Sequence, residues 1–234
     1  MKREIVLPGS LLITGNNLKA GLYTFKEDSS IYAGLLGLFE RDSIKDKGVV
    51  NIIPLKGKYY PKEGDNVIGI IVKTHLFSWL VDINSFVYAI LPFANAVKAK
   101  GKKKVKKFEL NLANYLSIGD VIYAKIVSFD RNSPPILSLK EKKGLGKVTS
   151  GFLLNISPAK IPRFIGKKLS MINMIREKLG IKIIVGRNGR IIAFTDDENK
   201  IEILKKIIEK IELESHTSGL TDRIKMFLES VKNV

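Results

Sequence analysis

The chain of 234 residues contains no cysteine and only two histidines, His75 and His216. A protein without cysteine forms neither disulfide bonds nor zinc sites with thiolate ligands, and this composition fits a reducing compartment. The two histidines lie far apart in the sequence, so they provide little material for a metal site. We therefore predict that the chain binds no metal ion and no other cofactor.

Long hydrophobic runs and catalytic motifs are also missing. No apolar run reaches the roughly 18 residues of a membrane-spanning helix, and residues 1–8 are too short and too charged for a signal peptide. The sequence contains neither a Gly-x-Ser-x-Gly motif nor a phosphate-binding P-loop. We therefore expect a cytoplasmic protein that does not associate with membranes and is not an enzyme.

Acidic residues are the minority among the charged residues. Lys and Arg together number 40 against 23 Asp and Glu, which gives a net charge of +17. Such an excess raises the local concentration of polyanions, of which nucleic acid is the first candidate. Because 45% of the residues are hydrophobic, the chain is expected to be globular rather than disordered. These properties predict a globular protein that binds nucleic acid.

The pattern of turns and strands predicts three domains. Residues 1–63 hold short β-branched runs between glycine-containing turns, which is typical of a small all-β domain. Residues 64–145 predict five short strands, the third at 86–91, with one long interruption after it, and this suits an OB-type barrel. Residues 146–234 mix strands with amphipathic helices. We therefore predict a multi-domain α+β protein.

The second domain resembles an S1 RNA-binding domain. The likeness rests on the stretches 64–73, 79–83, 89–92, 119–120 and 136–140. S1 domains bind single strands on an open sheet face, where stacking of a base on an aromatic ring contributes about 1–3 kcal/mol. The resemblance implies Phe77 as a stacking residue, with His75, Trp79 and Phe93 as neighbouring candidates. For each of them, packing in the core or against another domain is the alternative.

A lysine tract follows the third predicted strand of this barrel. Seven of the ten residues 98–107 are lysine, namely Lys98, Lys100, Lys102, Lys103, Lys104, Lys106 and Lys107. Lysines on a loop bind phosphates as point charges and give affinity that depends on salt but not on base sequence. We predict that the tract contacts RNA, and that Arg131 in the last barrel turn contacts a phosphate. The alternative is a solvated loop without a binding role.

The third domain resembles a KH domain in its β-α-α-β-β-α order, with an extra helix at its end. KH domains grip RNA with a Gly-x-x-Gly loop, because two glycines let the RNA backbone approach the protein backbone. The corresponding residues here are Gly166, Lys167, Lys168 and Leu169. The resemblance implies that Lys167 and Lys168 pair with phosphates. Since Leu169 replaces a glycine, the alternative is a loop retained only as part of the fold.

The order of a small β domain, an S1 domain and a KH domain resembles the S1- and KH-bearing cap subunit of the archaeal RNA exosome. Residues 54–65 and the turn at 186–189 are most like that family. Membership implies a non-catalytic protein that joins other cap subunits in a trimeric cap. The cap would sit on a hexameric exonuclease ring of two alternating catalytic-type subunits, docked through the N-terminal domains. The resemblance also implies recruitment of RNA, with a preference for adenine-rich 3′ tails, for phosphorolytic 3′-to-5′ degradation.

Two related architectures fit the sequence less well. Polynucleotide phosphorylase places its KH domain before its S1 domain and needs large catalytic domains. Bacterial-type transcription factors with S1 followed by KH carry a second KH domain, for which too few residues remain. A translation- or transcription-associated S1/KH protein that does not bind a nuclease remains the alternative function.

Overall fold

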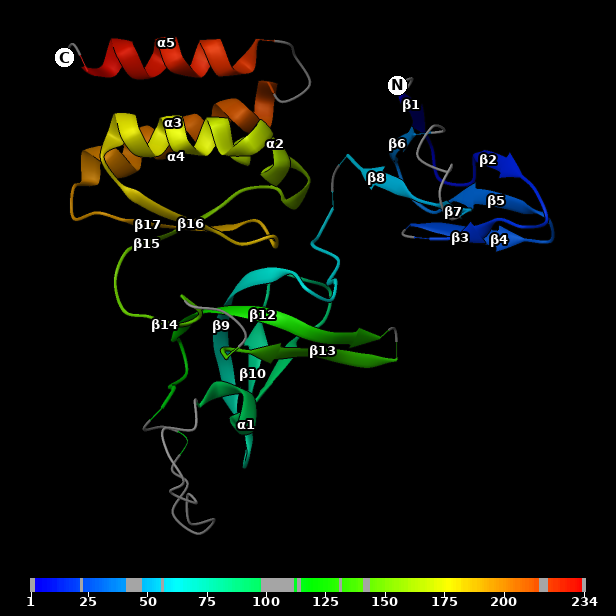
Figure 1. Cartoon of the computed structure of the whole chain (residues 1–234), viewed down its shortest axis with the longest axis horizontal. Helices are drawn as coiled ribbons and strands as arrows, with labels where there is room; N and C mark the ends of the chain where they lie inside the picture. Colours follow the sequence, from blue (N-terminus) through cyan, green and yellow to red (C-terminus); the bar gives the residue numbers. More distant parts are fainter. Residues whose placement is uncertain are drawn as a thin grey trace. The chain divides into compact units, whose positions relative to one another are not determined.

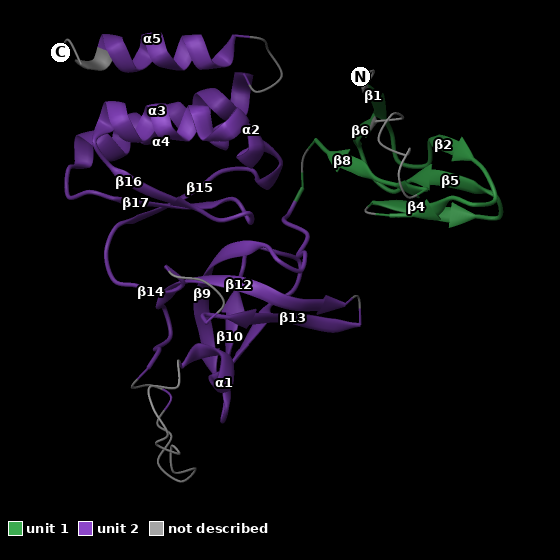
Figure 2. Cartoon of the chain, in the orientation of Figure 1, with its two compact units in different colours: residues 1–57 green, residues 58–234 purple. Residues whose placement is uncertain are grey.

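The computed structural model describes residues 3–21, 23–40, 48–55, 57–97, 112, 115–130, 132–140, 144–214 and 219–232. The chain divides into two compact units, residues 1–57 and residues 58–234 (Figure 2). The second unit contains a barrel followed by a three-stranded sheet with helices on one face (Figure 1). The predicted three-part α+β organisation is confirmed, and the last two parts form one unit.

The first unit is built from short strands. They are β1 (Arg3–Val6), β2 (Leu11–Thr14), β3 (Lys19–Ala20), β4 (Thr24–Glu27), β5 (Ser30–Ala33), β6 (Gly37–Glu40), β7 (Val49–Val50) and β8 (Ile52–Pro54). Two sheets have three strands, in the orders β1-β6-β8 and β2-β5-β4, and β3 pairs with β7. Val6, Ile31, Phe39 and Ile52 belong to the core of the unit. Since side chains alternate along a strand, each sheet also turns a second face away from this core.

The barrel of the second unit closes through five strands. They are β9 (Asn66–Thr74), β10 (Ser78–Asp82), β11 (Ala89–Pro92), β12 (Val121–Asp130) and β13 (Ser133–Ser138), with the short helix α1 (Phe93–Ala96) after β11. The strand order is β11-β10-β9-β12, and β13 closes the barrel because it pairs with both β11 and β12. The strand predicted at 86–91 begins only at Ala89, so Phe86 lies in the connection that precedes it. Strand β14 (Gly146–Val148) extends the sheet beside β12.

Two glycine–aspartate pairs form turns that lead into barrel strands. Gly64 and Gly119 both adopt a φ of +89°, a conformation that costs glycine little. Asp65 accepts a hydrogen bond of 2.6 Å from the Tyr59 hydroxyl, and Asp120 accepts one of 2.8 Å from the Ser117 backbone N–H. Burial, followed by the hydrogen bond to Asp65, raises the pKa of Tyr59 far above its usual value. The Tyr59 hydroxyl therefore stays protonated and acts as a donor.

The C-terminal part of the second unit has the element order expected for a KH domain. Its elements are β15 (Phe152–Asn155), the 3-10 turn Pro158–Lys160, α2 (Ile161–Ile165), the 3-10 turn Lys167–Leu169, α3 (Ser170–Leu179), β16 (Lys182–Val185), β17 (Arg190–Phe194), α4 (Glu198–Glu214) and α5 (Leu220–Lys232). The sheet order is β15-β17-β16, and the helices lie on one face of it (Figure 1). Ile175, Leu204 and Ile224 join the three longer helices in one core.

The loop that connects α2 with α3 keeps a glycine-like backbone without its second glycine. Gly166 has a φ of +75°, Lys168 of +49° and Leu169 of +66°. Leu169 lies in the left-handed region, which costs a residue with a Cβ atom about 1–2 kcal/mol, and half of it is exposed. The backbone at position 169 therefore has a conformation that favours glycine, the residue that KH domains have there.

The turn between β16 and β17 joins the KH-like part to the barrel through Asn188. Its side chain is fully buried, and its amide nitrogen donates to the carbonyl oxygens of Ile68 at 2.7 Å and Ile83 at 2.8 Å. Its amide oxygen accepts from the Ile68 N–H at 3.2 Å. In return, the Asn84 side chain donates to the Asn188 carbonyl oxygen at 2.9 Å. One asparagine thus satisfies backbone groups of two separate barrel segments.

Arg190 adds a charged bond to the same joint. Its guanidinium donates to the backbone oxygen of Asp82 at 2.6 Å and forms an ion pair of 2.5 Å with the Asp82 carboxylate. The Arg190 side chain is almost fully buried, so this pair is poorly screened by solvent. Gly186 completes the joint, because an added Cβ would lie 2.9 Å from the Ile68 nitrogen. The barrel and the KH-like part therefore form one compact unit.

The joint predicts a large effect for a small substitution. Asn188→Ala should lower the free energy of unfolding by about 2–4 kcal/mol, since a buried polar group left without a partner costs about 1–3 kcal/mol. Urea unfolding of the whole chain measures this change. Asn173→Ala is the matched control, because Asn173 is exposed and should change the stability by less than about 0.5 kcal/mol. Equal midpoints for the two variants would refute the role of Asn188.

The strained loop predicts a gain in stability. Leu169→Gly should raise the free energy of unfolding by about 1 kcal/mol, because glycine adopts a positive φ without a steric penalty. Met226→Gly, an exposed position within α5, should instead lower it by about 1 kcal/mol. Thermal unfolding measures both variants, and a loss of stability in Leu169→Gly would contradict the strain argument.

Candidate nucleic-acid interface

The tip of the β9–β10 hairpin presents apolar side chains to solvent. Leu76 is 78% exposed and Phe77 is 51% exposed, and His75 beside them is also exposed. The His75 N–H donates to the Ser78 carbonyl oxygen at 2.8 Å, and the Phe77 carbonyl oxygen accepts from the Phe93 N–H at 2.9 Å. Backbone bonds thus hold the tip while its rings face the solvent, as a stacking surface requires.

Trp79 does not belong to this exposed surface. It is fully buried in the barrel core, and its indole N–H donates to the Leu116 carbonyl oxygen at 3.0 Å. The cause is the alternation of side chains along a strand. Trp79 points to the inside of the barrel, whereas its neighbours on β10, Ser78 and Leu80, are half-buried. The prediction of Trp79 as a base-stacking residue is therefore corrected, because neither its ring faces nor its N–H can reach RNA in this structure.

Phe93 lies between the core and the surface. It is half-buried, with its ring centroid 6.2 Å from that of Trp79 and 5.2 Å from that of Tyr115, the latter edge to face. Tyr115 is 43% exposed and continues the aromatic row outward. Tyr115 could not be predicted as a neighbour of Phe93, because it lies in the long interruption between strands, where no periodicity indicates its contacts.

Most of the predicted basic contacts lie outside the described residues. These are Lys98, Lys100, Lys102, Lys103, Lys104, Lys106, Lys107 and Arg131. The described chain reaches Val97 directly after α1, whose first residue, Phe93, bonds to Phe77. The last described residue before the lysine tract, Val97, therefore lies at the same end of the barrel as the Phe77 tip.

The loop of the KH-like part carries a second basic surface. Lys167 and Lys168 are exposed and so are accessible for the predicted phosphate contacts, and Arg163 on the preceding helix is exposed as well. Between residues 157 and 176 the sequence contains five cations and no acidic residue. Arg163 was not singled out from the sequence, although this run without acids is the signal that indicates it.

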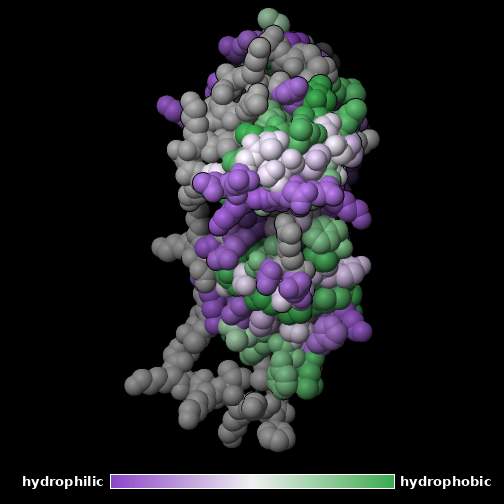
Figure 3. Space-filling model, turned by 90° about the vertical axis from the view of Figure 1, so that its right-hand side faces the viewer, coloured by the Kyte–Doolittle hydropathy of each residue, from purple (hydrophilic) through white to green (hydrophobic). Residues whose placement is uncertain are grey.

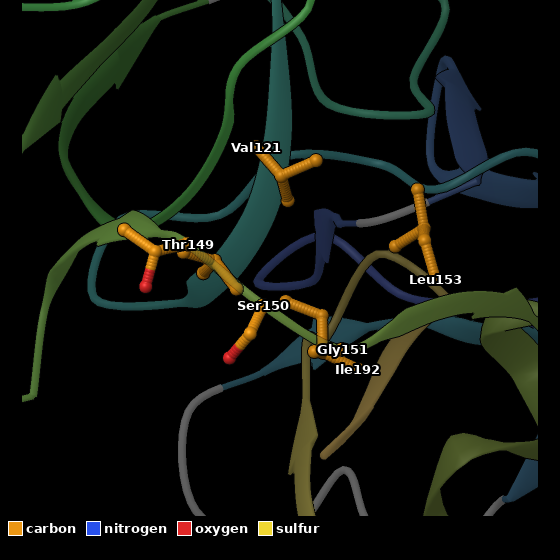
Figure 4. A pocket seen from close by; sticks show the side chains of 7 residues that line it. Val121, Thr149, Ser150, Gly151, Leu153 and Ile192 are labelled. Atoms are coloured by element: carbon orange, nitrogen blue, oxygen red, sulfur yellow. The ribbon is translucent and has the colours of Figure 1, made fainter. Parts of the chain in front are cut away.

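Two cavities of the second unit lie away from the exposed aromatic and basic residues described above. A small pocket of about 130 Å³ lies where the chain crosses from the barrel to the KH-like part (Figure 4). Its lining residues are Val121, Val148, Thr149, Ser150, Gly151, Leu153 and Ile192, and none of these carries a charge. A groove of about 250 Å³ between α3, α4 and α5 has an apolar floor with Lys178, Asp197 and Lys200 at its rim. Neither cavity coincides with the exposed aromatic tip.

The described part of the chain holds no group of three or more His, Asp or Glu side chains that could bind a metal ion. None of its helices is both long and apolar enough to cross a membrane.

Comparison with protein-family models gives three matches in order along the chain. Residues 3–56 match the N-terminal domain of the exosome RNA-binding protein RRP4, residues 58–128 match the S1 domain of RRP4, and residues 151–193 match a KH domain. These matches cover both compact units. The KH match includes the loop at 166–169 and the turn at 186–189.

Curated relatives and a solved structure agree with these matches. The exosome complex component Rrp4 of Thermofilum pendens is 43% identical over 97% of this chain and 93% of its own length. The Rrp4 proteins of Saccharolobus solfataricus and Thermococcus kodakarensis are 42% and 40% identical, each over 97% of this chain, and over 88% and 85% of their own lengths. A crystal structure described as an exosome complex RNA-binding protein is 37% identical, with a TM-score of 0.63 over 76% of this chain and 98% of that one. The chain belongs to the Rrp4 family of exosome RNA-binding proteins.

Proposed function

We propose that this protein is the RNA-binding cap subunit of an archaeal exosome, acting in the cytoplasm without catalytic activity of its own. It captures RNA, with a preference for adenine-rich 3′ tails, and passes it to a hexameric 3′-to-5′ phosphorolytic exonuclease ring. Cap subunits form a trimeric cap on this ring. The observation that carries the proposal is the similarity to Rrp4 proteins over 97% of the chain, with all three domains in order.

RNA capture is assigned to the end of the barrel that holds the β9–β10 tip. Phe77 provides an exposed ring for stacking, with His75 beside it and Phe93 behind it. We assign phosphate contacts to the lysine tract, which follows Val97 directly in the sequence. Stacking and phosphate pairing together suit single strands of varied sequence, because every base has a stacking face. Lys167 and Lys168 provide further phosphate contacts on the KH-like part.

Docking on the ring is assigned to the first unit, which exposes apolar side chains in rows across both of its three-stranded sheets. Cross-strand pairing aligns Leu11, Tyr32 and Phe25 in one row, in which the rings of Phe25 and Tyr32 stack at 5.5 Å. It aligns Ile5, Leu38 and Ile53 in the other row. Four of these six side chains, Ile5, Leu11, Phe25 and Ile53, are exposed. Figure 3 shows apolar surface among hydrophilic side chains on one face of the chain. Apolar rows on so small a domain indicate a protein partner.

The lysine tract predicts a change in salt dependence. Replacing Lys102, Lys103 and Lys104 together with Ala should weaken binding to all single-stranded RNAs alike. The slope of log K against log salt should become shallower by about 2, because each lost phosphate contact on a single strand removes about 0.7. Fluorescence anisotropy with labelled oligonucleotides at several salt concentrations measures this slope. An unchanged slope would rule out the tract as a phosphate-binding element.

The apolar rows predict a separation of docking from RNA binding. Leu11→Asp should abolish association with the exonuclease ring, because a carboxylate would be buried against the partner, and should leave RNA affinity unchanged. Leu213→Asp is the matched control, since Leu213 is an exposed leucine on α4 in the other unit. Size-exclusion chromatography of the mixed components reads out association. Normal assembly of Leu11→Asp, or no assembly of the wild-type chain, would count against docking through this row.

A further inference from the structure

A cluster of aromatic rings stands on the barrel surface away from the Phe77 tip. Tyr60 precedes the first barrel strand, Phe86 lies in the β10–β11 connection, and Phe129 is near the end of β12. The Tyr60 ring centroid lies 5.4 Å from that of Phe86 and 5.7 Å from that of Phe129. We refer to these three residues as the aromatic ledge.

The ledge is held in place by the barrel core and by backbone bonds, because Tyr60 and Phe129 are half-buried and Phe129 packs against the core. Tyr59 and Ser85 form a parallel β-bridge, and the Ser85 hydroxyl donates to the Tyr59 carbonyl oxygen at 2.9 Å. These bonds set Tyr60 beside Phe86, while Tyr59 turns inward to the core. Phe86 nevertheless remains 56% exposed, and Tyr88 two residues further on is 55% exposed. The ring of Phe86 therefore has surface available for a ligand.

The barrel core does not explain why Phe86 is aromatic. The core cluster contains Tyr59, Trp79 and Leu91 from the neighbouring segments, but not Phe86. A single exposed apolar side chain is normal on a protein surface, but Phe86 is part of a cluster of rings, and both Phe86 and Tyr88 are more than half exposed. Such a cluster of exposed rings points to a ligand.

A cation stands at the same end of the barrel as the ledge. Asn84, two residues before Phe86, donates to Asn188, which follows Arg187 in the KH-like turn. Arg187 is exposed, and its charge is close enough to act on the Tyr59 hydroxyl. Its guanidinium makes no hydrogen bond or ion pair with any residue in the described part of the chain. The S1–KH joint therefore holds the turn that carries Arg187 against the barrel segment that leads to Phe86.

We propose that the aromatic ledge is a second stacking site for single-stranded RNA, with Arg187 as its phosphate contact. Rings that offer stacking faces beside a cation are the combination that binds single strands without base readout. The ledge and the Phe77 tip lie beyond opposite ends of the five-residue strand β10, so at least about 13 Å separates them. A strand that spans both would be held at two points on one rigid barrel. The assignment rests on the proposed RNA-binding function and adds to it a site at the other end of the barrel.

The test compares three replacements of Phe86 in the full-length chain. Phe86→Ala should weaken binding of a labelled oligoadenylate by about 5- to 150-fold, which corresponds to the loss of one stacked base. Phe86→Leu should lose nearly as much, because leucine keeps apolar area without a stacking face, whereas Phe86→Trp should bind at least as well as the wild type. The salt slope should stay unchanged in all three, since no charge is removed. Phe152→Ala, an exposed phenylalanine on β15, is the control and should bind like the wild type.

The outcomes separate this inference from the function on which it rests. If the wild-type chain binds RNA and Phe86→Ala binds equally well, only the ledge assignment is overturned. Full affinity of Phe86→Leu would overturn stacking. If Phe86→Ala no longer associates with the exonuclease ring but keeps its RNA affinity, the ledge contacts protein instead of RNA. If the wild-type chain itself does not bind RNA, both proposals fail.

Discussion

The buried Asn188 side chain is the interaction on which the arrangement of the second unit depends. It bonds to the backbone of Ile68 and Ile83, two barrel segments that follow each other only through the β9–β10 hairpin. Water cannot replace these bonds where the residue is fully buried, so the contact is specific in position and register. Arg190 and Asp82 add charge to the same place. Because of this joint, the KH-like part and the barrel form one compact unit rather than two domains on a flexible linker. Their basic and aromatic residues therefore lie on the surface of the same unit.

In the proposed function, this unit divides RNA recognition between two kinds of side chain. Aromatic rings at the Phe77 tip and at the ledge offer stacking, which tolerates any base, and the lysines offer charge, which tolerates any sequence. The turn at 186–189 is occupied by the joint and exposes only Arg187. The loop at 166–169 has positive φ angles that suit glycine, but Leu169 puts a side chain where a glycine would let the RNA backbone approach. The barrel therefore carries the larger share of the proposed RNA contacts.

Sequence patterns predicted the architecture well because they depend on local chemistry. Short strand-like runs predicted the five barrel strands, and amphipathic periodicity predicted helices in residues 146–234, where the structure has α3 and α4. Individual side chains were harder to predict, since their exposure depends on which face of a strand meets the core. Trp79 was predicted to stack on bases but is buried in the barrel core. Phe86 was predicted to lie in a strand but lies in an exposed connection between two strands. The ledge unites three segments that are distant in sequence, so no local pattern could indicate it. The contact of Asn188 with the barrel could not be predicted from the sequence either. An Asn-Gly pair is typical of a two-residue hairpin turn, so it gives no reason to expect a further contact.

The central claim is that this chain captures RNA on behalf of a partner nuclease, and reconstitution tests it most directly. The affinity of the exonuclease ring for an adenine-rich single strand, and the rate of its phosphorolytic degradation, are measured with and without the chain. The account predicts tighter binding and faster degradation at low RNA concentration when the chain is present. The same affinity and rate in both samples, with the chain shown to be folded, would contradict it.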